Sequence, residues 1–131
     1  MLEYVENPVL RAEELAALFR SSGIRRPVDD LPRLERMLRE ANLVIAARHG
    51  GCWVGIARAL TDFVYCCYLS DLAVAKEYQR QGIGRELVRR VRQRLGEQSM
   101  LLLLAAPEAA EYYPRLGFEA VPNGWIIHRQ R

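Results

Sequence analysis

Two glycines, Gly82 and Gly84, lie between a polar run and the start of a helical pattern in the stretch YQRQGIGREL, residues 78–87. A glycine inside regular structure costs about 0.5–1 kcal/mol relative to alanine, so this pair indicates a backbone with a special task. The first N–H groups of a helix have no partner within it, and the helix dipole favours an anion there. The spacing therefore predicts that the N–H groups of residues 80–85 hold a diphosphate.

Two common nucleotide loops do not fit this stretch. A phosphate-binding loop of the Walker type needs Gly-Lys-Ser/Thr, whereas Gly84 is followed by Arg85 and Glu86. A dinucleotide-binding loop needs a third glycine, and that position is Leu87. On the two glycines alone, a helix cap without a ligand remains an equally good interpretation.

The elements that must position this loop follow from hydrophobic periodicity and turn residues. Patterns of helical and strand type alternate along the chain and predict a mixed sheet, hence an α/β fold with helices on both faces. The expected helices are 11–19, 31–41, 84–95 and a short one at 107–113; the expected strands are 42–49, 52–60, 63–74, 99–106, 117–121 and 125–129. The run 99–106 has four successive leucines and predicts a strand buried on both faces.

Length and composition narrow the class of protein. A chain of 131 residues fits one domain, 1–131, without a metal or disulfide staple. No run approaches the roughly 20 apolar residues of a membrane span, and the acidic start MLEYVENP does not resemble a signal peptide. Cys52, Cys66 and Cys67 lack metal-ligand spacing and are expected to be free thiols in a reducing cytoplasm.

The positive charge is concentrated in one region of the chain. The net charge is +3, Lys76 is the single lysine, and six arginines fall between Arg80 and Arg94. Such an excess indicates either an anionic partner or a solvated helix face. A nucleic-acid partner is disfavoured because the same helix carries an apolar stripe and begins at the glycine pair.

The wider sequence around the glycines resembles a known family. The stretch DLAVAKEYQRQGIGREL, residues 71–87, resembles the core motif of the GNAT acetyltransferases, and YYPRLGF, residues 112–118, resembles their Tyr-x-x-x-Gly-Phe ending. The resemblance extends from Leu10 to the C-terminus. It implies the GNAT acyl-CoA N-acyltransferase fold, a central mixed sheet in which two parallel strands, here 63–74 and 99–106, splay apart.

The resemblance also implies acetyl-CoA as co-substrate, with no metal. The pyrophosphate would lie on the loop that starts the helix, and the pantetheine arm would pair with main-chain groups at the end of strand 63–74. Arg80 and Arg85 are the arginines best placed to meet phosphates. The implied binding residues are Leu72, Ala73, Val74, Gln79, Arg80, Gln81, Gly82, Ile83, Gly84, Arg85 and Tyr113.

The resemblance assigns a proton-donor role to Tyr113, because a phenol with a pKa of about 10 is protonated at neutral pH and can donate to the departing thiolate. The alternative is that Tyr113 only packs under the co-substrate, and Pro114 disturbs the helical geometry there. Asp71 is a candidate general base and, equally, a structural carboxylate. A backbone N–H near Val74 is the natural donor to the oxyanion.

These features predict an N-acetyltransferase that moves an acetyl group from acetyl-CoA to a primary amine of a small molecule by direct attack in a ternary complex. A protein amine as acceptor, or a non-catalytic acetyl-CoA sensor, remains the alternative. The loop 21–30 carries Arg25, Arg26, Asp29 and Asp30, so its charge indicates no single class of acceptor. Nucleic-acid and membrane partners are not expected. A homodimer is expected, through the apolar edge strand 125–129.

Overall fold

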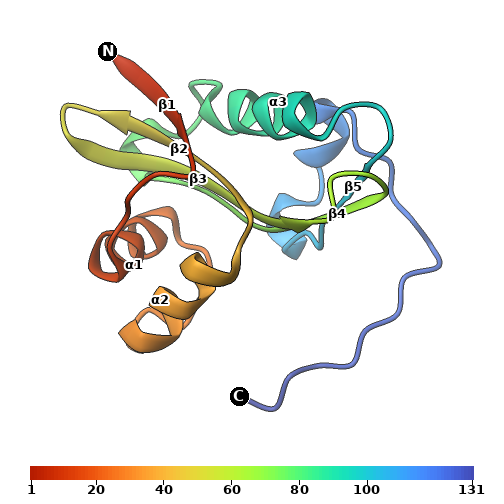
Figure 1. Ribbon diagram of the computed structural model, residues 1–131, viewed down its shortest axis with the longest axis horizontal. Helices are drawn as coiled ribbons and strands as arrows, with labels where there is room; N and C mark the ends of the chain where they lie inside the picture. Colours follow the sequence, from red (N-terminus) through yellow and green to blue (C-terminus); the bar gives the residue numbers. More distant parts are fainter.

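The computed structural model describes all residues, Met1–Arg131, as a sheet between helices (Figure 1). Three α-helices and five strands form the body, joined by short 3-10 turns. In chain order these are β1 Leu2–Glu6, α1 Ala12–Ser22, α2 Leu31–Glu40, β2 Leu43–His49, β3 Cys52–Thr61, β4 Cys66–Val74, η1 Lys76–Tyr78, α3 Ile83–Leu95, β5 Met100–Leu102, η2 Pro107–Ala109 and η3 Tyr113–Leu116.

The strands lie side by side in chain order, from β1 to β5. The first three pairings are antiparallel, and only β4 and β5 are parallel. The connection between those parallel strands is α3, as a crossover helix must be for parallel neighbours. The α/β class with a mixed sheet, predicted from the sequence, is therefore confirmed.

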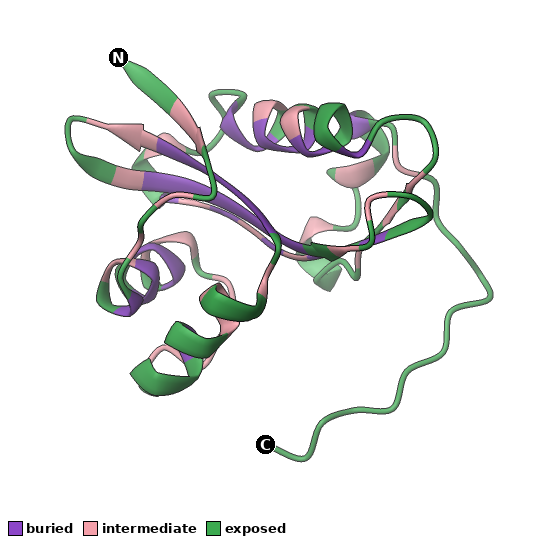
Figure 2. Cartoon of the chain, viewed as in Figure 1, coloured by how far each residue is buried: buried purple, intermediate pink, exposed green.

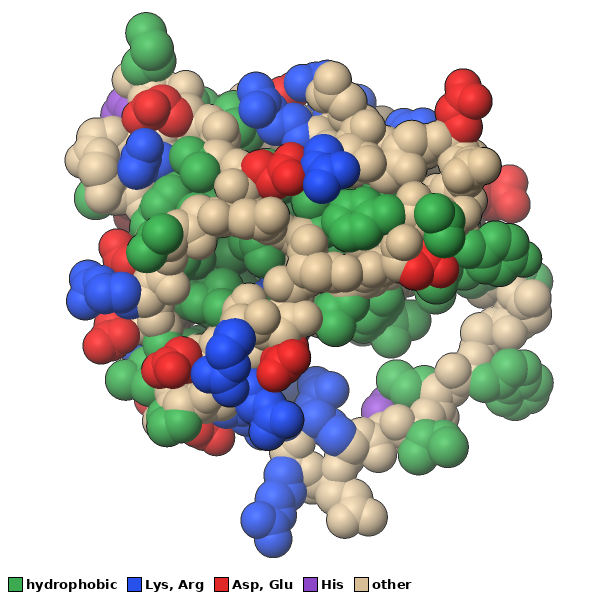
Figure 3. Space-filling model, in the orientation of Figure 1, with side chains coloured by type: hydrophobic (Ala, Val, Ile, Leu, Met, Phe, Trp, Pro, Cys, Tyr) green, Lys and Arg blue, Asp and Glu red, His purple; other side chains and the backbone are tan.

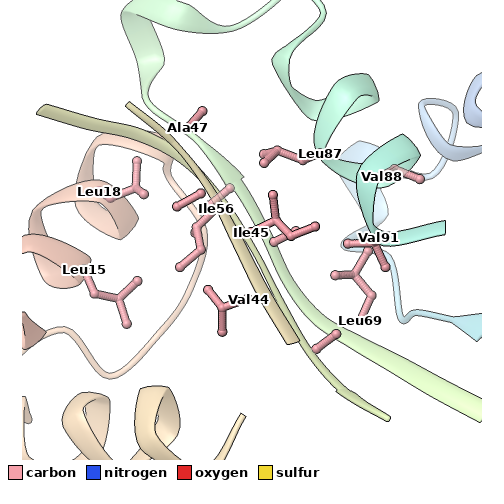
Figure 4. Packing of buried hydrophobic residues seen from close by; sticks show 14 of the residues in the cluster. Leu15, Leu18, Val44, Ile45, Ala47, Ile56, Leu69, Leu87, Val88 and Val91 are labelled. Atoms are coloured by element: carbon pink, nitrogen blue, oxygen red, sulfur yellow. The ribbon is translucent and has the colours of Figure 1, made fainter. Parts of the chain in front are cut away.

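Helices cover both faces of the sheet. α1 and α2 lie on one face and α3 on the other (Figure 1). The buried residues concentrate in the middle strands and on the inward faces of α1 and α3 (Figure 2). Figure 4 shows Leu15 and Leu18 of α1 on one side of the sheet, and Leu87 and Val91 of α3 on the other. This central packing fixes where α3 begins.

Each of the two N-terminal helices ends or starts where the sequence dictates. Gly23 adopts a left-handed conformation, φ +85°, and its N–H donates to the carbonyl of Phe19, which ends α1. The Asp30 carboxylate accepts from the N–H of Arg33 at 3.2 Å and caps α2. The loop between these two residues is thereby held against the C-terminal half of β4.

Two irregularities of β4 shape the centre of the molecule. Leu69 pairs with Ala59 and Asp71 with Arg58, so Ser70 is the extra residue of a β-bulge. The parallel pairing with β5 stops at Tyr68 and Leu102. Beyond that point β4 continues to Val74 without a neighbour on this edge, which confirms the splay of the two parallel strands.

The predicted strand 99–106 is wrong in length and in burial. Only Met100–Leu102 are paired, and Met100, Leu102 and Leu104 are exposed. The leucines are apolar on both faces, but nothing within the chain covers the outer edge of β5. The run is apolar enough to be buried beside a further strand, but residues 103–131 do not form a strand that pairs with β5.

The two predicted C-terminal strands, 117–121 and 125–129, are absent. The chain turns at Pro122 and Asn123 as expected, yet residues 119–131 run as an extended tail with a single hydrogen bond, from Arg33 to the carbonyl of Arg131. A strand exists only through pairing, and the tail lies away from the sheet (Figure 1).

Two further differences concern short elements. The predicted helix 107–113 is two 3-10 turns, η2 and η3; Pro114 disfavours α-helical geometry at Tyr113 and has no N–H to donate. The strand β1, residues 2–6, has no counterpart in the sequence prediction. It is an edge strand with exposed and half-buried side chains, so its hydrophobic alternation is weak.

Candidate functional site

The start of α3 presents a row of free backbone donors. Arg80 and Gly82 have left-handed φ angles of +65° and +85°, which turn the loop into the helix without a side-chain cap. The first α-helical bond is that from the N–H of Glu86 to the carbonyl of Gly82. The N–H groups of residues 80–85 make no hydrogen bond within the chain. This arrangement can bind a diphosphate.

Gly84 makes room for a neighbouring side chain. A Cβ at this position would collide with the hydroxyl of Tyr112, whereas Gly84 itself has ordinary helical geometry. Burial raises the pKa of the Tyr112 phenol, and the nearby Arg85 guanidinium lowers it. The phenol of Tyr112 therefore lies against the loop, and at Gly84 the motif of residues 71–87 contacts the motif of residues 112–118.

A cavity of about 930 Å³ opens where β4 and β5 part. Leu72, Ala73, Val74, Gln79 and Tyr113 line it on the side of the loop. The loop between α1 and α2, the end of β5 and the C-terminal tail form its other walls. Figure 3 shows the tail standing off from the body with an open space between them.

Tyr113 lies half-buried at this cavity. Its ring packs edge-on against Phe118, with centroids 5.6 Å apart, and against Tyr112 at 5.4 Å. Burial raises the pKa of the Tyr113 phenol, Tyr112 raises it further and Arg26 lowers it. Pro114 is accommodated because the segment is a 3-10 turn that begins at Tyr113. The phenol can thus hold a proton beside the splayed strands.

The outer edge of β4 carries polar main-chain groups. The Gln79 amide donates to the carbonyl of Val74 at 2.9 Å and to that of Ser22 at 3.3 Å. Ala75, in contrast, donates to Val54 of the neighbouring β3. Because alternate residues of a strand turn to the same edge, the N–H groups of Leu72 and Val74 face the splay. An amide-bearing chain could pair with them as an added strand does.

Asp71 is fully buried between two arginines. Its Oδ1 accepts from Nε of Arg26 at 2.5 Å, and its Oδ2 accepts from Nε of Arg58. The side chain does not line the cavity. Both carboxylate oxygens accept from guanidinium groups and the side chain lies outside the cavity, so this geometry favours the structural alternative for Asp71.

The arginines of the helical region separate into groups. Arg80 and Arg85 are exposed beside the loop. Arg89 and Arg90 both donate to Glu86 at 2.7 Å, and these bonds hold the pKa of the Glu86 carboxyl at about 2. Arg90 and Arg94 also lie over the rings of Tyr4 and Phe63. Arg80 and Arg85 form no ion pair within the chain, so both are free to bind an anion beside the loop.

Arg26 and Arg58 are among the cavity residues that were not predicted from the sequence as site residues. Arg58 offered a signal, because a charged residue in the buried strand VGIARAL is unusual unless it is paired. Arg26 gave none, since its loop contains charges of both signs. No cluster of three or more His, Cys, Asp or Glu side chains could hold a metal ion. The helices are all too short or too polar to cross a bilayer.

The sequence and the fold were compared with those of known proteins. Residues 19–125 match the family model for the acetyltransferase (GNAT) domain. The chain belongs to the GNAT acetyltransferase family. The chloroplastic GCN5-related N-acetyltransferase 2 of Arabidopsis thaliana is 36% identical over 73 residues, 54% of this chain and 28% of that protein. The chain thus spans less than a third of that relative.

Solved structures share the GNAT fold over the whole chain. A probable acetyltransferase of unknown function from meticillin-resistant Staphylococcus aureus superposes with a TM-score of 0.85 at 20% identity, over 100% of both chains. The aminoglycoside N-acetyltransferase AAC(6')-Iy, solved in complex with CoA, gives 0.71 at 17% identity over 100% of this chain and 96% of the other. At these identities the likeness concerns the GNAT fold alone.

Proposed function

We propose that the protein transfers an acetyl group from acetyl-CoA to a primary amine of a small molecule by direct attack in a ternary complex. The observation that carries this proposal is the row of free N–H groups at residues 80–85, placed beside the splay of β4 and β5 in a GNAT domain. The free N–H groups suit a diphosphate, and the open edge of β4 at the splay suits an amide-bearing arm. CoA contains both, and a related fold is known with CoA bound.

The binding residues divide along the chain. Arg80, Gln81, Gly82, Ile83, Gly84 and Arg85 supply main-chain donors and two cations to the pyrophosphate. Leu72 and Val74 present their main-chain groups at the open strand edge to the pantetheine arm, whereas Ala73, between them, lines the cavity and turns its main-chain groups to β3. Gln79 braces the junction between them through its bond to Val74. The thioester then lies in the cavity beside Tyr113.

The reaction needs three contributions from the chain. The neutral amine nitrogen attacks the thioester carbonyl, a C–N bond forms, and the carbonyl oxygen gains charge that the N–H of Val74 can stabilise. The C–S bond then breaks, and Tyr113 donates its proton to the CoA sulfur. The proton released by the amine leaves to water and Tyr113 is reprotonated from solvent. Positioning of the two substrates supplies much of the rate gain.

Asp71 has a supporting role in this proposal. Its two charged hydrogen bonds fix Arg26 and Arg58 against the bulge at Ser70. The amine proton is therefore taken by solvent in the open cavity and not by this carboxylate.

A homodimer is proposed on separate grounds. Trp125 and Ile127 are 97% and 98% exposed, and the outer edge of β5 is open with exposed apolar side chains. Exposed apolar strands of this kind are usually covered. We infer that a second copy covers the tail, residues 119–131, and the edge of β5.

An assay of CoA thiol release against a panel of primary amines tests the activity. The panel should hold small amines and a lysine-containing peptide, since a small-molecule acceptor is proposed. Amine-dependent thiol release with an N-acetyl product supports the proposal. Release that is strongest with the peptide would move the acceptor to proteins, and tight acetyl-CoA binding without release on any amine would overturn the enzymatic function.

A further inference from the structure

Two guanidinium groups share one carboxylate beneath the cavity. Arg26 and Arg58 both bind Asp71, and no other carboxylate forms an ion pair with either of them. The side chain of Arg58 is 8% exposed, that of Arg26 is 23% exposed, and that of Asp71 is not exposed. The cluster therefore holds one positive charge in excess at the wall of the cavity, partly shielded from water, and a bound anion would compensate it.

Each of these guanidiniums keeps free donors. Arg26 donates to Asp71, to the carbonyl of Arg25 at 2.6 Å and to that of Ser70 at 2.8 Å. Arg58 donates to Asp71, to the carbonyl of Met37 at 3.2 Å and to Oγ of Ser70 at 3.0 Å. A guanidinium has five N–H groups, so each retains N–H groups without a partner. Both side chains line the cavity.

The rest of the cavity wall does not neutralise this charge. Arg33 faces the cavity from α2, and Glu108 is the only carboxylate in the lining. The side chains of His128, Arg129 and Arg131 in the tail add no negative charge. The acidic residues of the loop 21–30 point elsewhere, because Asp29 pairs with Arg20 at 3.0 Å and Asp30 caps α2. Of the charged residues of this loop, Arg26 therefore lines the cavity, whereas Asp29 and Asp30 are paired elsewhere.

The cationic cluster lies close to the place of the chemistry. Arg26 and Tyr113 line the same cavity, and the charge of Arg26 acts on the Tyr113 phenol. A group bound to Arg26 would be a short distance from an amine that attacks the thioester. The cluster is also rigid, since Asp71 and Ser70 fix both guanidiniums, and a preorganised fork suits a carboxylate or phosphate.

We propose that the acceptor is an anionic primary amine, which carries a carboxylate or phosphate near the amino group, and that Arg26 with Arg58 binds the anion. This inference rests on the proposed function and names the substrate class of the same cavity. In the transfer, the amine nitrogen gains the acetyl group, the C–S bond of acetyl-CoA breaks, and one proton passes from the amine, through solvent and Tyr113, to the sulfur. The anionic group of the acceptor is unchanged.

Matched pairs of acceptors test the class directly with the unaltered protein. L-phenylalanine and 2-phenylethylamine differ only in the carboxylate, and O-phosphoethanolamine and ethanolamine only in the phosphate. We expect kcat/KM to be about tenfold or more higher for an anionic member, as a charge-assisted bidentate contact implies. Whichever pair shows the larger ratio identifies carboxylate or phosphate as the group recognised.

The variant Arg26→Gln tests the assigned residue, with Arg25→Gln as the matched control. Arg25 is exposed, adjacent in sequence and outside the cavity lining. We expect Arg26→Gln to raise KM for the anionic acceptor about tenfold or more, to leave the neutral acceptor and acetyl-CoA binding unchanged, and to be partly rescued in Arg26→Lys. Arg25→Gln should behave as the parent.

Different results would contradict the anionic acceptor and the acetyltransferase activity itself. Turnover of both members of each pair at equal kcat/KM, or a preference for the neutral member, would overturn the anionic acceptor and leave the acetyltransferase in place. Binding of acetyl-CoA with turnover of no amine would overturn the proposed function itself. An equal loss for neutral and anionic acceptors in Arg26→Gln would make the cluster purely structural and overturn its role in recognition.

Discussion

Tyr113 is the side chain on which the proposed chemistry most directly depends. Replacement of Tyr113 with Phe keeps the ring packing on Phe118 and removes the proton that the leaving thiolate needs. We expect kcat to fall by about 100-fold or more, the usual contribution of a general acid, with little change in acetyl-CoA binding. Steady-state kinetics and calorimetry measure the two quantities.

The pH profile provides a second readout of Tyr113. Burial raises the pKa of this phenol above its ordinary value, so the acid form persists to higher pH. The parent should therefore lose kcat on the alkaline side, above pH of about 10, and the Phe variant should lack this alkaline limb. Tyr112→Phe is the control and should retain the parent kcat; an equal loss in both variants would remove Tyr113 from its role.

Gly84 and Tyr112 give a second prediction at the residue scale. A Cβ at Gly84 meets the Tyr112 hydroxyl, but the ring carbon behind it lies at an ordinary contact distance of 3.5 Å. In the Tyr112→Phe background, Gly84→Ala should raise the free energy of unfolding by about 0.5–1 kcal/mol through helix propensity. In the parent background that gain should be lost, because Tyr112 must swing away. Denaturant unfolding of the four proteins measures the coupling, and additive effects would contradict the contact.

The sequence revealed the loop and the tyrosines because glycine spacing and a motif are local signals. It did not reveal the cationic cluster. Arg26 and Asp71 are far apart along the chain, and their contact depends on how the loop after α1 reaches the bulge at Ser70. Only the folded chain shows that Asp71 is held by two arginines.

At the scale of elements, the first turn of α3 combines its dipole with an ion-pair cluster. Glu86 accepts from Arg89 and Arg90, which lowers the pKa of its carboxyl from 4.5 to about 2. The carboxylate therefore stabilises the folded state above pH 4.5, and this contribution disappears as pH falls toward 2. The charged form at a helix start also suits the dipole.

The charge of Glu86 should affect how the free energy of unfolding changes at acidic pH. Glu86→Gln should lower the free energy of unfolding by about 0.5–1 kcal/mol at pH 7. The difference from the parent should vanish as pH approaches 2. Thermal unfolding over this range measures it, with Glu35→Gln, an exposed partner of Arg39, as control. A difference independent of pH would contradict the assigned role of the carboxylate.

Strands were predicted well where pairing partners lie within the chain and badly where they do not. The hairpin of β2 and β3 appears as its Gly50-Gly51 turn predicted. Residues 99–106, 117–121 and 125–129 have the apolar character of strands, yet only Met100–Leu102 are paired. Periodicity reports what a segment could bury, and pairing decides whether it becomes a strand.

At the scale of the whole molecule, the tail should determine the oligomeric state. Trp125→Asp with Ile127→Asp places charges on the tail, whose only hydrogen bond to the body is that of Arg33 with Arg131. We expect the parent to run as a dimer in light scattering and this variant as a monomer with unchanged secondary structure. Val9→Asp, an equally exposed apolar position outside the tail, should remain dimeric. A monomeric parent would contradict the proposal.

Calorimetric titration with acetyl-CoA tests whether the loop before α3 binds the diphosphate. Gly82 has φ +85° with open space before it, and Gly96, at the other end of α3, has φ +72° with open space too. Gly82 is left-handed, with ψ +6°, whereas Gly96 has ψ −157°, a region almost confined to glycine, so Gly96→Trp imposes at least as much backbone strain at the opposite end of the same helix. We expect the parent and Gly96→Trp to bind acetyl-CoA and Gly82→Trp not to bind it. Equal binding by both variants, or no binding by the parent, would contradict it.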